Sequence, residues 1–399
     1  MKKCKLLLIV GILLSTEVRS QNTRFIDSVF TTIDKTTVGY SSVFTDNYHK
    51  MDVYIPKGDV LSKRPLIFYI HGGAFYAGDK SSQDCVDFCT QFAKKGYVAV
   101  SVNYRLANAF LFLSDKKVQL STVLRSIADI KAALRFFVKD ATSTNQYRID
   151  TTAFFIGGYS AGAVAALHTA WVTTESELDQ NLKDILKNSI KTLYGDAGNN
   201  GYSNPIKAIF SMAGALYQTN YISPGDVPVW MGHAKDDATV SYNCAPGLNN
   251  PLVVNLCGTG KLIPELDTAK VLYDTMVMQT GGHDWPGLGN KGVYFKQAVA
   301  EIANFFYPMI GKPNASNGSF VETQIPKVYP NPANHSLFIE NKNMSSSSEY
   351  TLFNIIGQPA LKGILTETRE ALDISKLPRG LYFLSFSNSN YRSIQIVLD

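Results

Sequence analysis

The sequence predicts an α/β fold, in which helices flank a mostly parallel sheet, followed by a small antiparallel β-sandwich at the C-terminus. Between residues 51 and 279, seven apolar runs typical of strands alternate with helical stretches. A Gly-Tyr-Ser-Ala-Gly turn at residues 158–162 stands between one of these strands and an alanine-rich helix. After residue 311 the chain becomes polar and then shows short runs of period two.

Each element of the first domain follows from the apolar pattern. We expect its strands near residues 51–55, 65–70, 97–103, 153–157, 207–211, 227–232 and 275–279. The clearest helix covers residues 120–140, where apolar side chains recur on one face. A shorter helix is expected over residues 84–94, and a closing helix over residues 292–310. This alternation implies a mostly parallel sheet that is covered on both faces.

Two segments interrupt the alternation. Residues 172–205 contain a polar helix over residues 175–192, and residues 106–113 form an apolar loop. Either segment could wall a substrate pocket. Core packing is the alternative for the second, and whether the first forms a lid stays open.

Composition describes a soluble globular protein with more than one domain: 399 residues, 45% hydrophobic and 18% charged. Of the net charge of +5, residues 1–20 contribute +3, so the remainder carries about +2. Since no basic cluster stands out, we expect no nucleic-acid partner.

Residues 1–20 predict a secretory signal peptide. Basic residues precede an apolar stretch, Leu6 to Leu14, and Val18-Arg19-Ser20 is typical of a cleavage site. The stretch is too short for a stable transmembrane helix, so we expect no transmembrane anchor. The sequence therefore predicts a secreted or cell-surface protein, exported through the periplasm.

Export leaves Cys85, Cys89, Cys244 and Cys257 in an oxidising compartment. Three full pairings are possible. We favour Cys244–Cys257, because an i,i+4 bridge within one helix is strained and Cys85 and Cys89 can stay reduced. Zinc is disfavoured, because no histidine lies near these cysteines. We expect no metal and no cofactor.

Ser160 is the candidate nucleophile. A strand, a tight turn with a serine at its tip, and a helix form the context of a nucleophile elbow. Side chains at Gly158 and Gly162 would collide with the flanking strand and helix.

A serine hydroxyl needs a base, and His283 is the candidate. It follows the apolar run 275–278, at the strand end where open α/β sheets carry their sites. We expect His49 at the surface and His168 packed or half-exposed in the helix after Ser160. The remaining histidines are His71, His233 and His335.

The acid should lie between the serine and the histidine, as in α/β-hydrolases. Asp236 and Asp237 follow the strand that ends at His233. Neighbouring side chains point in different directions, so only one can orient the imidazole. The other is expected to be a solvated loop residue.

The loop after strand 65–70 is the candidate oxyanion hole. Acyl transfer needs fixed N–H groups that point at the developing oxyanion. Gly72 and Gly73 let the backbone approach, and the N–H of Ala161 would complete the hole.

Five motifs in order resemble the esterase and lipase branch of the α/β-hydrolase superfamily, near the carboxylesterases and the hormone-sensitive-lipase-like enzymes. The ending around His283 is also similar to feruloyl esterases and polyhydroxybutyrate depolymerases. The resemblance covers about residues 25–310 and implies a catalytic domain over residues 21–311. The motifs lie at residues 51–56, 71–74, 102–106, 158–162 and 281–286.

The resemblance also implies which aspartate is the acid. Family members often carry His-Gly-Thr-x-Asp-x-x-Val, and the matching run His233 to Val240 puts this acid on Asp237. The implied triad is then Ser160, Asp237 and His283. The chain departs from the pattern at residues 234 and 235, and Ala74 replaces a third glycine of the oxyanion loop.

Residues 312–325 predict a linker, and residues 326–399 a β-sandwich. Runs at residues 328–332, 350–357 and 377–382 resemble the C-terminal sorting domain of the type IX secretion system of Bacteroidetes. That resemblance implies secretion machinery as a partner. The chain ends in Leu398-Asp399, where this family commonly ends in a basic residue. A carbohydrate-binding sandwich is the alternative.

The sequence thus predicts a secreted serine esterase that hydrolyses small or polymer-linked carboxylic esters. A serine peptidase of the same fold and a non-catalytic binding protein are the alternatives. Peptidase relatives usually carry a large N-terminal propeller, whereas only some thirty residues precede the first predicted strand here. Short acyl chains, plant-wall acetyl or feruloyl groups and polyester units all stay open as substrates.

Overall fold

The computed structural model describes residues 24–311, 327–340, 348–354, 358–386 and 394–398. The chain divides into two compact units at Pro313/Asn314, and each is described by itself. The predicted signal peptide and linker lie outside the described residues. Within those residues, no helix is long and apolar enough to cross a membrane.

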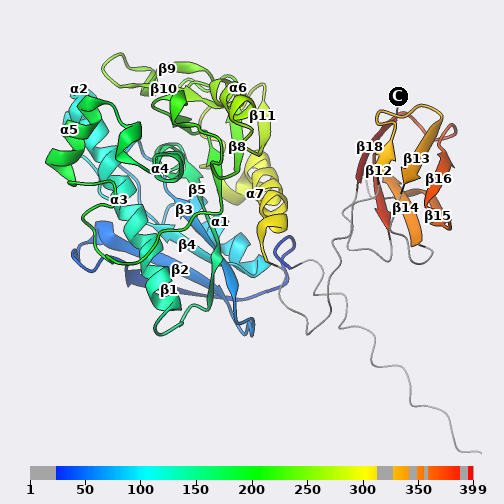
Figure 1. Ribbon diagram of the computed structural model, residues 1–399, viewed down its shortest axis with the longest axis horizontal. Coiled ribbons are helices and arrows are strands. Elements are labelled where there is room, and N and C mark those ends of the chain that lie inside the picture. The colour runs from blue at the N-terminus through cyan, green and yellow to red at the C-terminus, as the bar shows by residue number, and fades with distance from the viewer. Residues whose placement is uncertain (1–23, 312–326, 341–347, 355–357, 387–393, 399) are drawn as a thin grey trace, which may run out of the picture. The chain divides into compact units, whose positions relative to one another are not determined.

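The first unit is built on an eight-stranded sheet within its described residues (Figure 1). β2 pairs antiparallel with both β1 and β4, whereas the pairs from β4 to β11 are all parallel. The predicted mostly parallel sheet is therefore confirmed. The order is β1 (Ile33–Gly39), β2 (Lys50–Pro56), β4 (Val98–Val102), β3 (Arg64–Ile70), β5 (Ile149–Tyr159), β6 (Ala208–Met212), β8 (Val229–Ala234) and β11 (Tyr273–Met278).

Helices cover both faces of this sheet. The side chains of β3 therefore alternate between two buried cores, one on each face. Leu66 and Phe68 pack in the core that includes α3 and α4, and Ile67 and Tyr69 pack in the core that includes α1 and α7. The helices are α1 (Gln83–Lys95), α2 (Ala109–Ser114), α3 (Lys116–Ala141), α4 (Ala161–Trp171), α5 (Gln180–Ser189), α6 (Thr259–Ala269) and α7 (Val293–Phe306).

Three elements differ from the sequence prediction. β1 was missed because its side chains are mostly exposed, as befits an edge strand without an apolar face. Residues 106–113 are not a loop throughout, since Asn108 caps α2 by accepting a hydrogen bond from the Leu111 N–H at 3.3 Å. The polar helix expected over 175–192 is α5 preceded by a 3-10 turn, Glu175–Glu177.

A three-stranded ribbon forms a second, smaller sheet in this unit. Its order is β7 (Ala215–Leu216), β10 (Asn255–Gly258) and β9 (Cys244–Pro246). Cys244 and Cys257 face each other across β9 and β10 and form a disulfide, so the favoured pairing is confirmed. Cys85 and Cys89 are buried thiols on α1.

The second unit contains two antiparallel sheets, which confirms the small antiparallel domain predicted from the period-two runs. The first is β12 (Lys327–Tyr329), β13 (Ser336–Glu340) and β16 (Arg369–Asp373), and the second is β15 (Pro359–Leu365), β14 (Ser348–Asn354), β17 (Gly380–Phe386) and β18 (Ile394–Leu398). Buried Leu337, Leu352, Leu384 and Ile396 from both sheets share one core.

Candidate active site

Ser160 occupies the sharp turn between β5 and α4. Its backbone has φ 54° and ψ −120°, a conformation that costs a non-glycine residue energy and is found mainly at functional sites. The turn is held on both sides, because the Ser160 N–H donates to the Met212 carbonyl and the Val164 N–H donates to the Ser160 carbonyl, each at 2.9 Å. Ser160 itself is buried.

The glycines on either side of Ser160 are required by one backbone atom of the neighbouring strand β3. A Cβ added to Gly158 would lie 2.2 Å from the Ile70 carbonyl oxygen, and one added to Gly162 would lie 1.9 Å from it. No rotamer change relieves a clash between two backbones. Both glycines therefore let the turn pack closely against β3. The sequence predicted collisions with the strand and helix on either side of the turn, whereas the collision is with the neighbouring strand β3.

Ser160, His283 and Asp237 lie in one hydrogen-bonded row. The Ser160 Oγ is 2.8 Å from the His283 Nε2, and the His283 Nδ1 is 2.7 Å from the Asp237 Oδ2. The side chain of His283 is only 9% exposed and that of Asp237 is fully buried. With its proton on Nδ1, the imidazole donates to the carboxylate and accepts from the hydroxyl.

Asp237 is held as a carboxylate by four donors. Its Oδ1 accepts from the N–H groups of Thr239 and Val240 at 2.9 Å. Its Oδ2 lies 2.7 Å from the His283 Nδ1 and 3.4 Å from the His233 Nε2. Burial alone would raise the pKa of Asp237, but the hydrogen bonds from His233, His283 and the Val240 N–H outweigh burial and lower it.

His233 contacts Asp237 and helps to hold it in place. It is fully buried at the end of β8, and its one Nε2–H is shared between the Val240 carbonyl, at 2.9 Å, and the carboxylate of Asp237, at 3.4 Å. Its Nδ1 accepts from the Thr259 hydroxyl at 3.1 Å. These contacts fix the ring, and they also fix the loop that carries Asp237.

Asp236 is more than the solvated loop residue that the sequence suggested. Although it is exposed, its carboxylate accepts from the N–H groups of Gly281 at 3.3 Å and Gly282 at 2.9 Å. Gly282 has φ 61°, which favours glycine. Asp236 thus anchors the loop of His283, while Asp237 contacts the imidazole.

The predicted oxyanion loop leaves the end of β3 and turns sharply. Gly73 has φ 110°, and a Cβ there would lie 2.1 Å from the Ala77 carbonyl oxygen. Ala74 follows at φ 52°. The loop is anchored where it begins, because the Tyr104 hydroxyl donates to the His71 carbonyl at 2.8 Å.

Gly72 and Ala161 complete the set that the sequence named. A Cβ at Gly72 would lie 3.1 Å from the ring of Tyr159, the residue before Ser160, so this loop lies against the elbow. Ala161 is the buried first residue of α4.

Two other histidines, His49 and His168, are buried away from Ser160 Oγ and make hydrogen bonds within the fold. The expectation that His49 lies at the surface is wrong, since it is buried and contacts the carboxylates of Asp46 at 2.8 Å and Asp129 at 3.3 Å. His168 is buried in α4, where its Nδ1 donates to the Val164 carbonyl at 2.8 Å and its Nε2 accepts from the Tyr217 N–H at 3.2 Å. Burial lowers the pKa of His168 to about 4.

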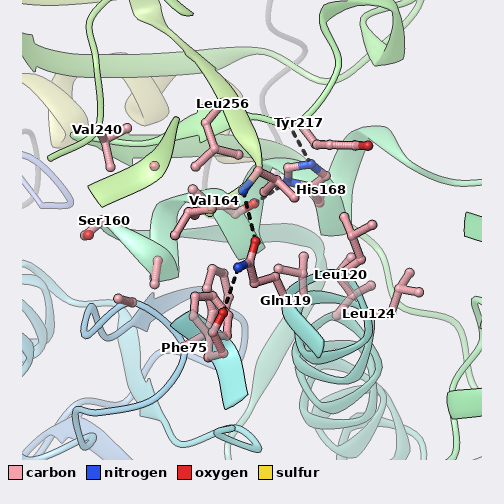
Figure 2. Close-up of a pocket in the computed structure, with 18 of the residues that line it drawn as sticks. Phe75, Gln119, Leu120, Leu124, Ser160, Val164, His168, Tyr217, Val240 and Leu256 are labelled. Carbon is pink, nitrogen blue, oxygen red and sulfur yellow. Dashed lines mark hydrogen bonds between the residues drawn. The ribbon is translucent and has the colours of Figure 1, made fainter. Parts of the chain in front are cut away.

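An apolar pocket opens beside Ser160 and runs along α4 (Figure 2). It encloses about 860 Å³ of empty space, including the part open to solvent. Its walls come from segments far apart in the sequence: α2, α3, α4, α5 and the loop between β9 and β10. The disulfide-closed segment thus forms part of the pocket wall.

Gln119, at the start of α3, is hydrogen-bonded to two other walls of the pocket, α2 and the loop between β9 and β10. This buried side chain donates to the carbonyls of Phe112 at 2.7 Å and Leu252 at 3.1 Å, and its Oε1 accepts from the Val254 N–H at 2.9 Å. Nothing beside Gln119 in the sequence indicates this role, because its partners lie 7, 133 and 135 residues away. The role of Asp236 could have been inferred from the sequence. Two glycines precede His283, and their backbone N–H groups need an acceptor, which a nearby carboxylate can supply.

Two family matches cover different parts of the chain. Residues 51–194 match the BD-FAE family, and residues 327–398 match the secretion system C-terminal sorting domain. The first match includes Gly72, Gly73 and Ser160 but ends before Asp237 and His283.

Two curated relatives each match about a third of the chain. Human arylacetamide deacetylase-like 2 is 30% identical over 134 residues, which make up 33% of this chain and 30% of that protein. Gut esterase 1 of Caenorhabditis briggsae is 29% identical over 126 residues, 32% of this chain and 21% of that protein. The chain thus spans less than a third of either relative.

Solved structures share the fold of the first unit. A truncated carbohydrate esterase from gut microbiota has a TM-score of 0.50 at 18% identity and covers 71% of this chain and 97% of its own. Thermogutta terrifontis esterase 2, phosphorylated by paraoxon, has a TM-score of 0.51 at 17% identity and covers 70% and 95%. Residues 51–194 therefore carry a BD-FAE domain within a unit that has the α/β fold of these solved esterases, and residues 327–398 carry a sorting domain that marks the chain as a secreted or cell-surface protein.

Proposed function

We propose that this protein is a secreted serine esterase that hydrolyses carboxylic esters through an acyl-enzyme on Ser160. The observation that carries the proposal is the hydrogen-bonded row of Ser160, His283 and Asp237 beside an apolar pocket. A side chain in each of the three roles, within hydrogen-bond reach of the next, is the arrangement that activates a serine hydroxyl.

In the first half-reaction, the Ser160 Oγ attacks the ester carbonyl carbon while the His283 Nε2 takes the hydroxyl proton. The tetrahedral intermediate then breaks its bond to the alcohol oxygen, and His283 returns the proton to the departing alcohol. In the second half-reaction, His283 takes a proton from water and the hydroxide adds to the acyl carbon. The acid leaves, and Ser160 regains its proton.

Asp237 orients the imidazole and balances its charge during both half-reactions. Its lowered pKa keeps it ionised, so it stabilises the imidazolium that forms when His283 takes a proton. The donors from Val240 and Thr239 keep the carboxylate in place while this charge appears and disappears.

The oxyanion would be held by the backbone N–H groups of Gly72, Gly73 and Ala161. The first N–H groups of a helix have no intrahelical acceptor, which supports the assignment of Ala161 at the start of α4. The left-handed backbone at Gly73 supports a loop that is bent to present N–H groups, and the closeness of Gly72 to the ring of Tyr159 supports the nearness of this loop to Ser160.

The ester is carried by a small molecule or a polymer. The names of the similar proteins, a carbohydrate esterase, a gut esterase and a deacetylase-like protein, support transfer of an acyl group to water. The C-terminal domain would act as a sorting signal that the secretion machinery recognises. We assign residues 1–20 to the signal peptide, 21–311 to catalysis, 312–325 to the linker and 326–399 to sorting.

Replacing the nucleophile tests the proposal. Ser160→Ala should lower kcat for p-nitrophenyl butyrate by about 10⁴-fold or more, because the acyl-enzyme cannot form. Ser143→Ala, in the exposed turn that follows α3, is the matched control and should retain wild-type turnover. Full turnover in Ser160→Ala would refute the esterase mechanism.

A further inference from the structure

We propose that the pocket beside Ser160 binds the acyl group, and that it is built for straight aliphatic acids of medium length. This inference rests on the esterase function proposed above and adds the substrate class. Three features carry it: the length of the pocket along α4, the hydrogen bonds that its polar side chains already make, and the apolar residues at its far end.

The length follows from the spacing of the lining residues on α4. Ser160, Val164 and His168 all line the pocket, and residues four apart lie on one helix face. Eight residues at 1.5 Å each make a floor of roughly 12 Å. In a zigzag chain each carbon–carbon bond of about 1.5 Å advances about 1.25 Å, so the seven bonds of an eight-carbon acyl chain cover about 9 Å. The bond to the Ser160 Oγ and the radius of the terminal methyl group add roughly 3 Å, so such a chain fills this floor.

Two polar side chains that line the pocket, Gln119 and His168, already make their hydrogen bonds to the protein. Gln119 uses both amide N–H groups and its oxygen, and His168 uses both ring nitrogens. His168 is neutral at ordinary pH because burial lowers its pKa to about 4. A sugar hydroxyl bound here would lose its water without a partner among these groups, which costs free energy. An alkyl chain needs no partner.

The far part of the pocket is apolar and belongs to a packed cluster. It is lined by five apolar side chains that belong to one hydrophobic cluster. These are Leu120 and Leu124 on α3, Val172 just after α4, Leu178 just before α5, and Leu182 on α5. Figure 2 shows Ser160 at one side of the pocket and Leu120 and Leu124 at the other. The segment that we predicted as a possible pocket wall, residues 172–205, supplies three of these five side chains.

A rival occupant is a hydroxycinnamoyl group, whose phenol would need a polar partner. Tyr217 and Tyr221 also line the pocket and could supply one through their hydroxyls. In Figure 2 the Tyr217 hydroxyl points away from the labelled apolar side chains. Tyr221 is therefore the residue with which to separate an aromatic acid from an aliphatic one.

The test is a chain-length profile on p-nitrophenyl acetate, butyrate, hexanoate, octanoate and dodecanoate, with methyl ferulate as the aromatic arm. Wild-type kcat/KM should rise about fourfold per methylene up to octanoate and then fall. Leu182→Trp should lower the octanoate-to-acetate ratio at least tenfold by filling the far part of the pocket. Leu182→Ala should shift the optimum towards dodecanoate, which keeps the test decisive if the larger side chain prevents folding.

Lys187→Trp is the matched control, because it adds the same bulk to the exposed face of α5 and should leave the profile unchanged. A profile that peaks at acetate overturns the inference. So does a preference for methyl ferulate that Tyr221→Phe abolishes. If no ester is hydrolysed and paraoxon does not label Ser160, the esterase proposal itself fails, whereas labelling with a flat profile refutes only the acyl site.

Discussion

The turn that carries Ser160 and the wall of the adjoining pocket are held in different ways. At the turn, backbone presses on backbone, since Gly158 and Gly162 both face the Ile70 carbonyl. At the wall, side chains from distant segments meet, and Gln119 joins α3 to the loop between β9 and β10. The turn that carries the nucleophile is thus set by close approach of backbone to backbone, whereas the shape that selects the substrate depends on side chains from distant segments.

This difference predicts how the two regions respond to substitution. Changes in the reacting row should abolish turnover on every ester, because each acyl group passes through Ser160. Changes in the wall should alter stability and the choice of ester but leave the chemistry in place. The predictions below run from the largest expected effect to the smallest.

The two adjacent aspartates should differ most. Asp237→Asn should lower kcat by about 10⁴-fold, because an amide favours the wrong imidazole tautomer. Asp236→Asn should lower it less than tenfold, because the amide oxygen still accepts from one of the two glycine N–H groups and Asp236 does not contact the imidazole. Steady-state kinetics on one soluble ester measures both. The opposite ranking would transfer the orienting role to Asp236.

Removal of the disulfide should weaken the wall without stopping the chemistry. Cys244→Ala combined with Cys257→Ala opens a bridge with a sequence separation of 13, which should lower the free energy of unfolding by about 3 kcal/mol. Urea unfolding measures this loss. A reductant should destabilise the wild type by the same amount and leave the double variant unaffected. A reductant that acts equally on both would show that the bridge does not support this segment.

Acid should weaken the pocket through His168. Its folded pKa of about 4 lies below the usual value of 6.5, so the unfolded chain binds the proton more tightly. Its contribution to stability is complete above pH 6.5 and is lost as the pH falls towards 4, by roughly 1.4 kcal/mol per pH unit. His168→Gln should reduce the slope of unfolding free energy against pH by one proton in this window. An unchanged slope would contradict a buried, neutral His168.

The sheet and the reacting residues could be predicted because their signals are local. A Gly-x-Ser-x-Gly turn between a strand and a helix, and a histidine just past the end of a strand, depend on neighbours in sequence. β1 was missed because an exposed edge strand carries no apolar alternation. The burial of His49 depends on Asp129, which lies 80 residues away, so nothing beside His49 reveals it.

The pocket could be predicted only in part. Residues 172–205 were named as a possible wall because they interrupt the alternation of strands and helices. The contribution of the loop between β9 and β10 was not foreseen, although the disulfide that closes it was. A local motif specifies where a chain turns, but which turns meet depends on the order of strands across the sheet.

Covalent labelling tests the central claim, that Ser160 is the nucleophile, most directly. Paraoxon phosphorylates the structurally similar Thermogutta terrifontis esterase 2, and it should form one adduct here, on the peptide that contains Ser160. The adduct should form in step with loss of ester hydrolysis and should be absent from Ser160→Ala. Peptide mass mapping that finds the adduct on another residue, with Ser160 unmodified and hydrolysis lost, would contradict the account.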